Sequence, residues 1–143
     1  MFQLLLSTIY TIIKVYILMN IILSKELPLP PSINSYYSQS RSGHRFKTNE
    51  AKAWENEAGH LLGRKITFSS SPVKVILYYY FKDNRSDLGN RTKILIDLLQ
   101  KMEIIDNDNQ VMEIHEFKNI NKNAPRVEIV VTAIGKKTDL IYE

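Results

Sequence analysis

The sequence predicts a single small domain of the mixed α/β (α+β) class, and three observations lead to this prediction. Its 143 residues are enough to bury one hydrophobic core but not two. Segments with the apolar spacing of helices alternate with segments rich in β-branched and aromatic residues. The composition, 44% hydrophobic and 24% charged, is that of an ordinary globular protein and excludes the disordered and fibrous classes. We expect a four-stranded mixed sheet with two main helices.

The charge balance and the absence of cysteine narrow the classes of function. Nineteen basic and fifteen acidic residues give a net charge of +4, a mild excess that is compatible with a polyanionic partner. No cysteine is present, which excludes a disulfide framework, a thiolate zinc site and a cysteine nucleophile.

The first 23 residues are almost continuously apolar. They are long enough to be a membrane anchor, but they lack the basic start and small-residue cleavage site of a signal peptide. Met19 directly precedes the first predicted strand and is itself a plausible start of translation. We therefore interpret residues 1–18 as a non-native extension or hydrophobic segment, residues 19–135 as the domain, and residues 136–143 as a tail without a motif. A membrane anchor and a signal segment are the alternatives.

The domain is predicted to begin with a strand at about Asn20 to Leu27. The proline-rich run Pro28 to Ser32 cannot be helical and predicts an extended turn. The stretch Ser38 to Lys47 is polar, basic and contains glycine, a composition typical of a mobile surface loop.

Aromatic and basic side chains gather in and just before this loop. They are Tyr36, Tyr37, Arg41, Arg45 and Lys47. Such side chains can stack on bases and neutralise phosphates, so we expect them to contact DNA. The alternative is a solvated loop with the tyrosines packed at its base.

A helix is predicted from the cap at Thr48 to about Leu62. Its core-facing residues, three or four apart, are Ala51, Trp54, Ala58 and Leu61. The dense apolar run Val73 to Phe81 predicts a central strand that is buried on much of both faces.

The second helix is predicted at about Asn90 to Met102. Its buried stripe consists of Ile94, Leu95, Leu98, Leu99 and Met102. Two further strands, about Val111 to Phe117 and Arg126 to Ile134, close the chain.

Carboxylates are concentrated around the second helix. Asp87 precedes it, Lys93 and Asp97 are four residues apart on one of its faces, and Asp106 and Asp108 follow its end. Hard oxygen ligands near a cation are what metal-assisted phosphodiester hydrolysis requires. The structural alternative is that Asp87 or Asn90 caps the helix, that Lys93 and Asp97 form a surface ion pair, and that the segment after the helix is a polar turn.

Four motifs occur in an order that resembles a known family. The pattern PPSxNxYY is followed by a basic loop and helix, then by DLxNxxKxxxD, and then by DND with QV shortly after. This order resembles the RusA family of Holliday-junction resolvases over about Asn20 to Ile134. The resemblance implies a homodimeric RusA-like domain that cuts four-way DNA junctions with Mg²⁺ or Mn²⁺ in recombination and repair. It also implies a cytoplasmic location and no membrane partner, unless the first 23 residues are an anchor.

The resemblance also implies roles for particular residues. It makes Asp87 and Asp108 the metal ligands and Lys93 the catalytic cation. We also expect Arg85, in the loop before the helix, to contact DNA. Two positions depart from the family pattern, because Gly89 and Asn107 stand where the family usually has acids. Asp97, Asp106 or a water supplies the missing oxygen, or the chain binds junctions with impaired catalysis.

The predicted helix raises a geometric question about the two acids at its ends. A helix of roughly 13 residues separates its ends by about 20 Å, while metal ligands must converge on one ion. Asp87 and Asp108 can meet within one chain only if the segment after Met102 folds back along the helix. Alternatively, antiparallel helices in a homodimer would bring together Asp87 of one subunit and Asp108 of the other.

Overall fold

The computed structural model describes residues 1–63 and 71–134, except for the side chains of residues 16–20. It confirms the mixed α+β class. Four strands form one sheet in the order β1-β6-β4-β5, with β4 and β5 parallel and the other neighbours antiparallel. The strands are β1 (Ile21–Leu27), β4 (Val73–Phe81), β5 (Val111–Ile120) and β6 (Arg126–Ala133).

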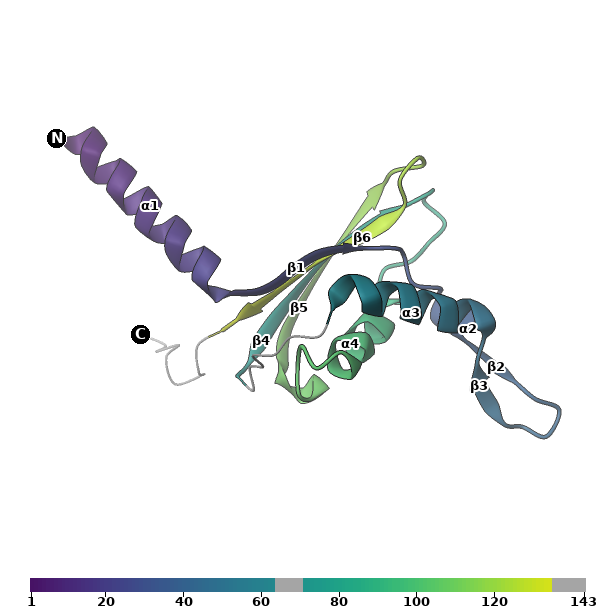
Figure 1. Cartoon of the computed structure of the whole chain (residues 1–143). Helices are drawn as coiled ribbons and strands as arrows, with labels where there is room; N and C mark the ends of the chain where they lie inside the picture. The colour runs from purple at the N-terminus through teal and green to yellow at the C-terminus, as the bar shows by residue number, and fades with distance from the viewer. Residues whose placement is uncertain (64–70, 135–143) are drawn as a thin grey trace.

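The central strand β4 organises the core. Its alternate residues Val73, Val75, Leu77, Tyr79 and Phe81 are all buried on one face. Helices α3 (Asn49–Leu62) and α4 (Thr92–Lys101) cover that face (Figure 1). Since β4 and β5 are parallel, the chain must cross over between them, and α4 lies in this crossover.

Helix α3 begins as predicted, with the Thr48 hydroxyl accepting a hydrogen bond from the Ala51 amide at 3.2 Å. Ala51, Trp54 and Ala58 are buried, but the placement of Leu61 in the core is wrong. Leu61 is 44% exposed and Leu62 is 5% exposed. The helical repeat continues from Ala58 by four residues rather than three, which turns Leu62 toward the sheet.

The predicted mobile loop at Ser38 to Lys47 is instead a β-hairpin. Strand β2 (Tyr37–Gln39) pairs with β3 (Arg45–Lys47), after the single-turn helix α2 (Ile33–Tyr36). Gly43 in the connecting turn has φ +86°, a conformation that favours glycine. Figure 1 shows the hairpin projecting beyond the helices, at the end of the molecule opposite α1.

The apolar N-terminal segment forms helix α1 (Phe2–Asn20), so the first strand starts at Ile21. Figure 1 shows α1 extending away from the sheet. Its large apolar side chains between Met1 and Val15 are exposed. In the part of the chain that the structure describes, no helix is both long and apolar enough to cross a membrane. The interpretation of residues 1–18 as a non-native extension stays a prediction.

The last two predicted strands are present, and β5 is longer than expected. It continues to Ile120, three residues beyond the predicted end at Phe117. In the sheet of the described residues β5 is an edge strand, and most of its side chains are exposed. The C-terminal tail, 136–143, lies outside the described residues.

Candidate active site

Helix α4 presents the predicted catalytic lysine on its outer face. Ile94, Leu95, Leu98 and Leu99 are buried in the core, as predicted, while Met102 is partly buried. The side chains of Lys93 and Asp97 remain 67% and 50% exposed. The helix begins after Arg91, and no side chain caps it. The capping alternative for Asp87 and Asn90 is therefore wrong.

The first turn of α4 is attached to three other parts of the fold. The Thr92 hydroxyl shares a hydrogen bond of 2.9 Å with the Tyr79 hydroxyl of β4 and donates another to Glu116 of β5. Burial raises the pKa of Tyr79, so this phenol stays protonated. The Arg91 guanidinium donates a hydrogen bond of 2.8 Å to the carbonyl of Pro30, which lies in the connection between β1 and α2. These contacts fix Arg91 and Thr92, the two residues that precede Lys93.

Two carboxylates meet the Lys93 ammonium. It forms an ion pair with Asp97 at 2.8 Å, as the surface-pair alternative predicted, and a second with Asp108 at 3.7 Å. Asp108 comes from the segment after the helix, so this segment folds back along α4 within one chain. This reversal brings Asp108 to Lys93, but Asp87 and Asp108 make no contact with each other among the described residues, so a site that these two acids share stays a prediction.

A short 3₁₀ helix, η1 (Asp108–Gln110), holds Asp108 in this place. The Gln100 side chain of α4 accepts a hydrogen bond from the Asp108 amide at 3.1 Å. The buried Gln110 side chain accepts from the amides of Asp106 and Asn107 and donates to the Ser71 carbonyl at 2.9 Å. Neither contact was predicted: Gln110 entered the sequence analysis only as part of the QV pattern, and a polar residue next to an acidic loop carries no local sign that it is buried.

Asn107 caps this turn, so it has a structural use at the position where the family usually has an acid. Its side-chain oxygen accepts a hydrogen bond from the Asn109 amide at 3.0 Å. The asparagine therefore supports the turn that carries Asp108.

The electrostatics of the cluster keep Lys93 charged. The hydrogen bond to Asp97 raises the pKa of the lysine above its ordinary value, and the charges of Asp97 and Asp108 act in the same direction. Each carboxylate uses one oxygen in its contact with the ammonium. The other oxygens stay available to a ligand, since both side chains are about half exposed.

The other acids of the predicted site lie apart from this cluster. Asp87 is exposed in the loop before α4, and its carboxylate makes no hydrogen bond or ion pair with a described residue. Asp106 is also exposed, without contact to Lys93. Within residues 1–63 and 71–134, no group of three or more histidines and acids is placed to hold a metal ion.

The residues present nevertheless fit a hard divalent cation. Asp97 and Asp108 contact the same ammonium, so their carboxylates already face one point. Mg²⁺ keeps several waters and often takes only one or two carboxylates from the protein, together with phosphate oxygens of the substrate. Gly89 has φ +91°, where an L side chain is strained, so the local backbone favours glycine at this departure from the family pattern.

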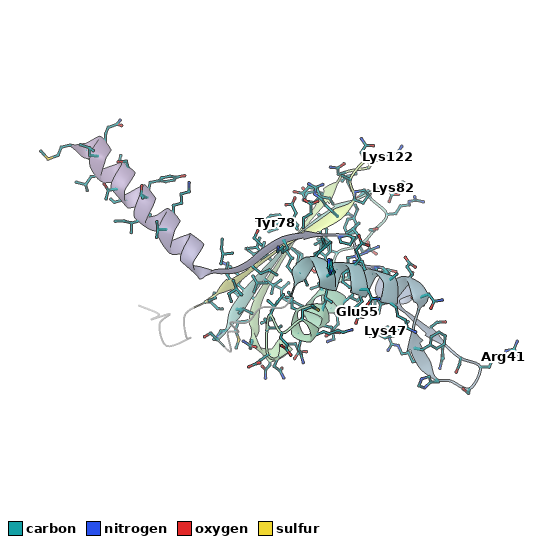
Figure 2. All side chains as sticks on the ribbon, viewed as in Figure 1. Arg41, Lys47, Glu55, Tyr78, Lys82 and Lys122 are labelled. Atoms are coloured by element: carbon teal, nitrogen blue, oxygen red, sulfur yellow. The ribbon has the colours of Figure 1, made fainter. Side chains whose placement is uncertain are left out.

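The predicted DNA contacts fall into an exposed group and a buried group. Arg41 lies at the tip of the hairpin (Figure 2), and the Arg45 guanidinium lies 4.0 Å from the centre of the Tyr37 ring. Arg85 is exposed and paired with Asp83, whose pKa it lowers to about 2 by hydrogen bonding. In contrast, Tyr36 is 5% exposed and packs edge-on against Trp54, which agrees with the packing alternative for this tyrosine.

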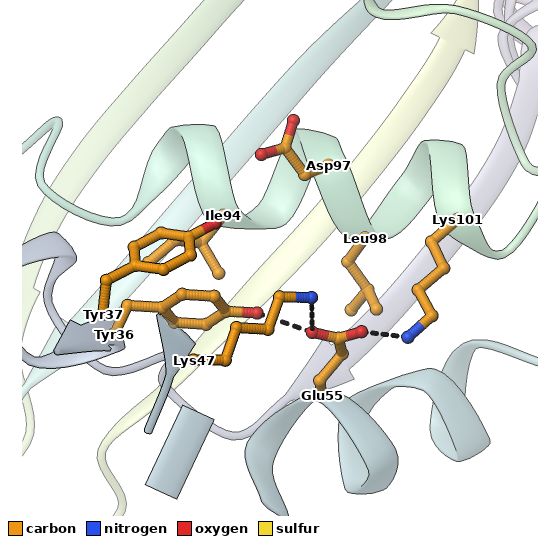
Figure 3. A pocket seen from close by; sticks show the side chains of 8 residues that line it. All are labelled: Tyr36, Tyr37, Lys47, Glu55, Ile94, Asp97, Leu98 and Lys101. Atoms are coloured by element: carbon orange, nitrogen blue, oxygen red, sulfur yellow. Dashed lines mark hydrogen bonds and ion pairs between the residues drawn. The ribbon is translucent and has the colours of Figure 1, made fainter. Parts of the chain in front are cut away.

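A second charged cluster, absent from the predictions, lies between the hairpin and α4. Figure 3 shows Glu55 receiving hydrogen bonds from Tyr36, Lys47 and Lys101 at a pocket of about 60 Å³. Burial alone would raise the pKa of Glu55, but these three hydrogen bonds outweigh it and lower the pKa to about 2. Lys47, predicted to contact DNA, is thus engaged with a buried carboxylate.

Comparison with known proteins identifies the group to which this architecture belongs. Residues 28–132 match the family model described as endodeoxyribonuclease RusA. The chain belongs to the RusA family. A RusA crossover junction endodeoxyribonuclease from Aquifex aeolicus is 31% identical over 111 residues, covering 74% of this chain and 85% of the relative. A protein of the same name from Escherichia coli O139:H28 is 27% identical over 115 residues, covering 78% and 95%.

The RusA match spans the hairpin, both sheet-covering helices, β4, β5 and all but the last residue of β6. It therefore includes Lys93, Asp97 and Asp108, and it confirms the family predicted from the order of the motifs. Helix α1 lies before the matched residues.

Proposed function

We propose that this chain is a metal-dependent endonuclease that resolves four-way DNA junctions in recombination and repair. The observation that carries the proposal is the placement of Lys93 between Asp97 and Asp108 on the exposed face of α4. Both relatives are named crossover junction endodeoxyribonucleases, which supports DNA as the substrate. This function would place the chain with the DNA in the cytoplasm.

Asp97 and Asp108 would hold Mg²⁺ or Mn²⁺. Asp87, which lies apart from them in the free chain, would join them only if the loop before α4 moved toward the cluster when DNA and metal bind. Such an ion polarises a phosphoryl oxygen and lowers the pKa of a bound water. Lys93 stays protonated beside the two acids and offsets the negative charge that develops on the phosphate. The exposed face of α4 also suits a bulky polymer, which could not enter a closed cavity.

The hairpin supports the DNA part of the proposal. Arg41 and Arg45 are exposed on an arm that projects from the body, and each can neutralise a phosphate. Replacing both arginines with alanine should weaken junction binding and reduce the salt dependence by roughly one unit of slope per lost phosphate contact. An unchanged slope would exclude the hairpin from the interface.

A homodimer would give two symmetric cuts, and the edge strand β5 supports such an assembly. Its exposed apolar side chains are Met112, Ile114, Phe117 and Ile120. If two β5 strands pair antiparallel about Phe117, each Glu116 lies opposite Lys118 of the other copy. Opposite charges facing one another across such a pair are favourable, and both copies of α4 then lie on the same side of the joined sheet.

A junction-binding protein with impaired catalysis is the second candidate, and Gly89 favours it. The family usually has an acid at this position, and here the backbone adopts φ +91°. The described residues also lack a third acid beside Asp97 and Asp108. Fewer carboxylates would weaken the binding of a hard cation.

Cleavage of a synthetic four-way junction with Mg²⁺ or Mn²⁺ tests both candidates. The chain, a version starting at Met19, and the Asp87→Asn and Asp108→Asn variants are compared, with linear duplex as the control substrate. Asp106→Asn is the matched control variant, because Asp106 is an exposed neighbour without contact to Lys93. Cleavage that depends on Asp108 but not on Asp106 supports the nuclease. Tight junction binding without cleavage supports the second candidate, and the absence of both excludes each of them.

A further inference from the structure

A buried carboxylate joins four elements of the fold beside the candidate active site. Glu55 of α3 is 8% exposed. It accepts hydrogen bonds of 2.8 Å from the Tyr36 hydroxyl of α2 and from the Lys47 ammonium of β3. The Lys101 ammonium of α4 donates to its other oxygen. Figure 3 shows the three donors approaching Glu55 from both sides of the pocket.

Glu55 is poorly suited to binding a ligand itself. One of its oxygens serves Tyr36 and Lys47, and the other serves Lys101. A carboxylate with three donors, buried under the pocket, has little capacity left for a metal or a substrate group. Its low pKa keeps it ionised at every pH at which the enzyme would work. Its effect must therefore pass through the residues that it holds.

On the hairpin side, Glu55 fixes the base of the arm. Most polar contacts of the hairpin remain within it, such as that of Gln39 with the Gly43 carbonyl and that of Arg45 with Tyr37. Lys47 is the β3 side chain for which the structure shows an ion pair with the body. Figure 2 shows Lys47 and Glu55 at the base and Arg41 at the far end.

Because the arm is long, a small rotation at its base moves its tip appreciably. Arg41 precedes Lys47 by six residues. Since the chain reverses around Gly43, the tip lies about four residues from Lys47, or roughly 13 Å, and a rotation of about 10° at the base displaces it by roughly 2 Å. A displacement of this size is enough to separate an arginine from a phosphate.

On the other side, Glu55 holds the helix that carries the candidate site. Lys101 lies in the last turn of α4, two turns beyond Lys93. Asp97, between them on the same helix, lines the pocket with Lys101 and Lys47. One carboxylate thus connects the base of the arm with the helix of the reacting groups.

We propose that Glu55 is a positioning residue that ties the β2–β3 hairpin to α4 and sets the orientation of the DNA-contacting arm relative to Lys93 and Asp97. This proposal rests on the proposed function in one respect, which is that the arm contacts DNA. The tie itself is a property of the free protein. It can be measured without DNA.

The first experiment measures the arm directly. The chain contains no cysteine, so Ser42→Cys at the hairpin tip and His60→Cys on α3 accept a single pair of spin labels. Pulsed electron paramagnetic resonance then gives the distribution of the distance between the labels. We expect a narrow distribution, which Glu55→Gln broadens about twofold because the amide lacks the charge that attracts both lysines. Glu57→Gln is the matched control, since Glu57 is an exposed glutamate of the same helix.

Lys47→Met keeps the proposal testable if Glu55→Gln does not fold. This variant removes the tie of the arm but leaves Glu55 paired with Lys101 and Tyr36. It should broaden the distribution as Glu55→Gln does. An unchanged distribution in a folded Lys47→Met or Glu55→Gln protein would overturn the tie.

The second experiment links the tie to DNA binding. A loosened arm must be ordered again on the junction, so Glu55→Gln should weaken binding about tenfold while the salt slope stays the same. Arg41→Ala should instead lower the slope, because it removes a phosphate contact. A broadened distance distribution together with an unchanged affinity for the junction would overturn the functional part of the proposal. If the unaltered chain neither binds nor cuts junctions, the proposed function fails, whereas the label distances still decide the tie.

Discussion

Helix α4 carries a lysine-carboxylate cluster at each end, and the two clusters are built in opposite ways. Near its start, one lysine faces two carboxylates, and all three side chains are half exposed or more. Near its end, two lysines face one carboxylate that is almost fully buried. The buried acid has a donor for each oxygen, whereas the exposed acids keep oxygens available.

This contrast distinguishes a site that can bind a ligand and take part in chemistry from a site that holds elements of the fold in place. A buried and fully paired carboxylate is costly to disturb, because removing any partner leaves an uncompensated charge in a poor environment. An exposed excess of carboxylates contributes little to stability and leaves negative charge that a cation can neutralise. We therefore propose that the Lys93 cluster carries the chemistry and that the Glu55 cluster positions the elements around it, and four predictions test this division.

Asp108→Asn should reduce junction cleavage by roughly 10³-fold, because a metal ion contributes several kcal/mol to stabilising the transition state. Calorimetric titration with Mn²⁺ should show weaker binding in the same variant. The melting temperature should stay within a few degrees, since Asp108 lies on the exposed side of α4. A large loss of stability with unchanged Mn²⁺ affinity would reverse the assignment of the two clusters.

Lys93→Ala should reduce cleavage by about 10²-fold or more while junction binding is retained, because a cation that acts on transition-state charge affects rate more than affinity. Single-turnover kinetics at saturating junction measure this effect. Lys52→Ala, at an exposed lysine of α3, is the control for the loss of one positive charge. Equal rates for the two variants would remove Lys93 from the reaction.

Acid should destabilise the fold through Glu55 in a defined window. The pKa of Glu55 is about 2 in the fold against an ordinary value of 4.5, so its contribution is complete above pH 4.5 and is lost as the pH falls toward 2. We expect about 2 kcal/mol of unfolding free energy to disappear across this window, less than the full linkage value because the lysines are partly exposed. Denaturant unfolding from pH 6 to pH 2 measures it.

Glu55→Gln should flatten this part of the pH profile, while Glu57→Gln should preserve it. Asp83, whose pKa is also about 2, titrates in the same window in both variants, so the comparison between them isolates Glu55. A profile that Glu55→Gln leaves unchanged would show that the buried cluster does not stabilise the fold.

Gly89→Ala and Gly89→Asp should each lower stability by about 1 kcal/mol, because both place a Cβ on a backbone with positive φ. No atom within 4 Å obstructs that Cβ, so no steric clash adds to the strain. The alanine variant is thus a matched control for the aspartate. Faster cleavage by Gly89→Asp than by Gly89→Ala would show that the open cluster is short of one metal ligand.

Features that form within one segment of the chain were predictable from sequence, whereas features that bring distant segments together were not. The strand Val73–Phe81 and the buried stripe of α4 follow from apolar spacing within single segments, and both are confirmed. The pairing of Lys93 with Asp97 follows from a separation of four residues. Leu61 was misplaced because spacings of three and four residues are both helical, and only packing decides between them.

The remaining features depend on residues that are far apart in the chain. The hairpin strands are only three residues each, which is too short for an apolar alternation to be recognised in the sequence. Asp108 reaches Lys93 through a reversal that relies on the buried Gln110. Glu55 is adjacent to the buried Trp54, but its three partners come from other elements and have no periodic relation to it.

The strand order of the sheet also determines when this chain can fold during synthesis. Within the sheet β1 pairs with β6 alone, so residues 21–27 find their partners only among residues 127–132. Strand β6 also separates β1 from β4. Closing so long a loop makes folding slow, and a growing chain exposes unpaired strands until β6 has left the ribosome. Any truncation before Arg126 should therefore leave β1 without a partner and yield an aggregation-prone protein rather than a smaller domain.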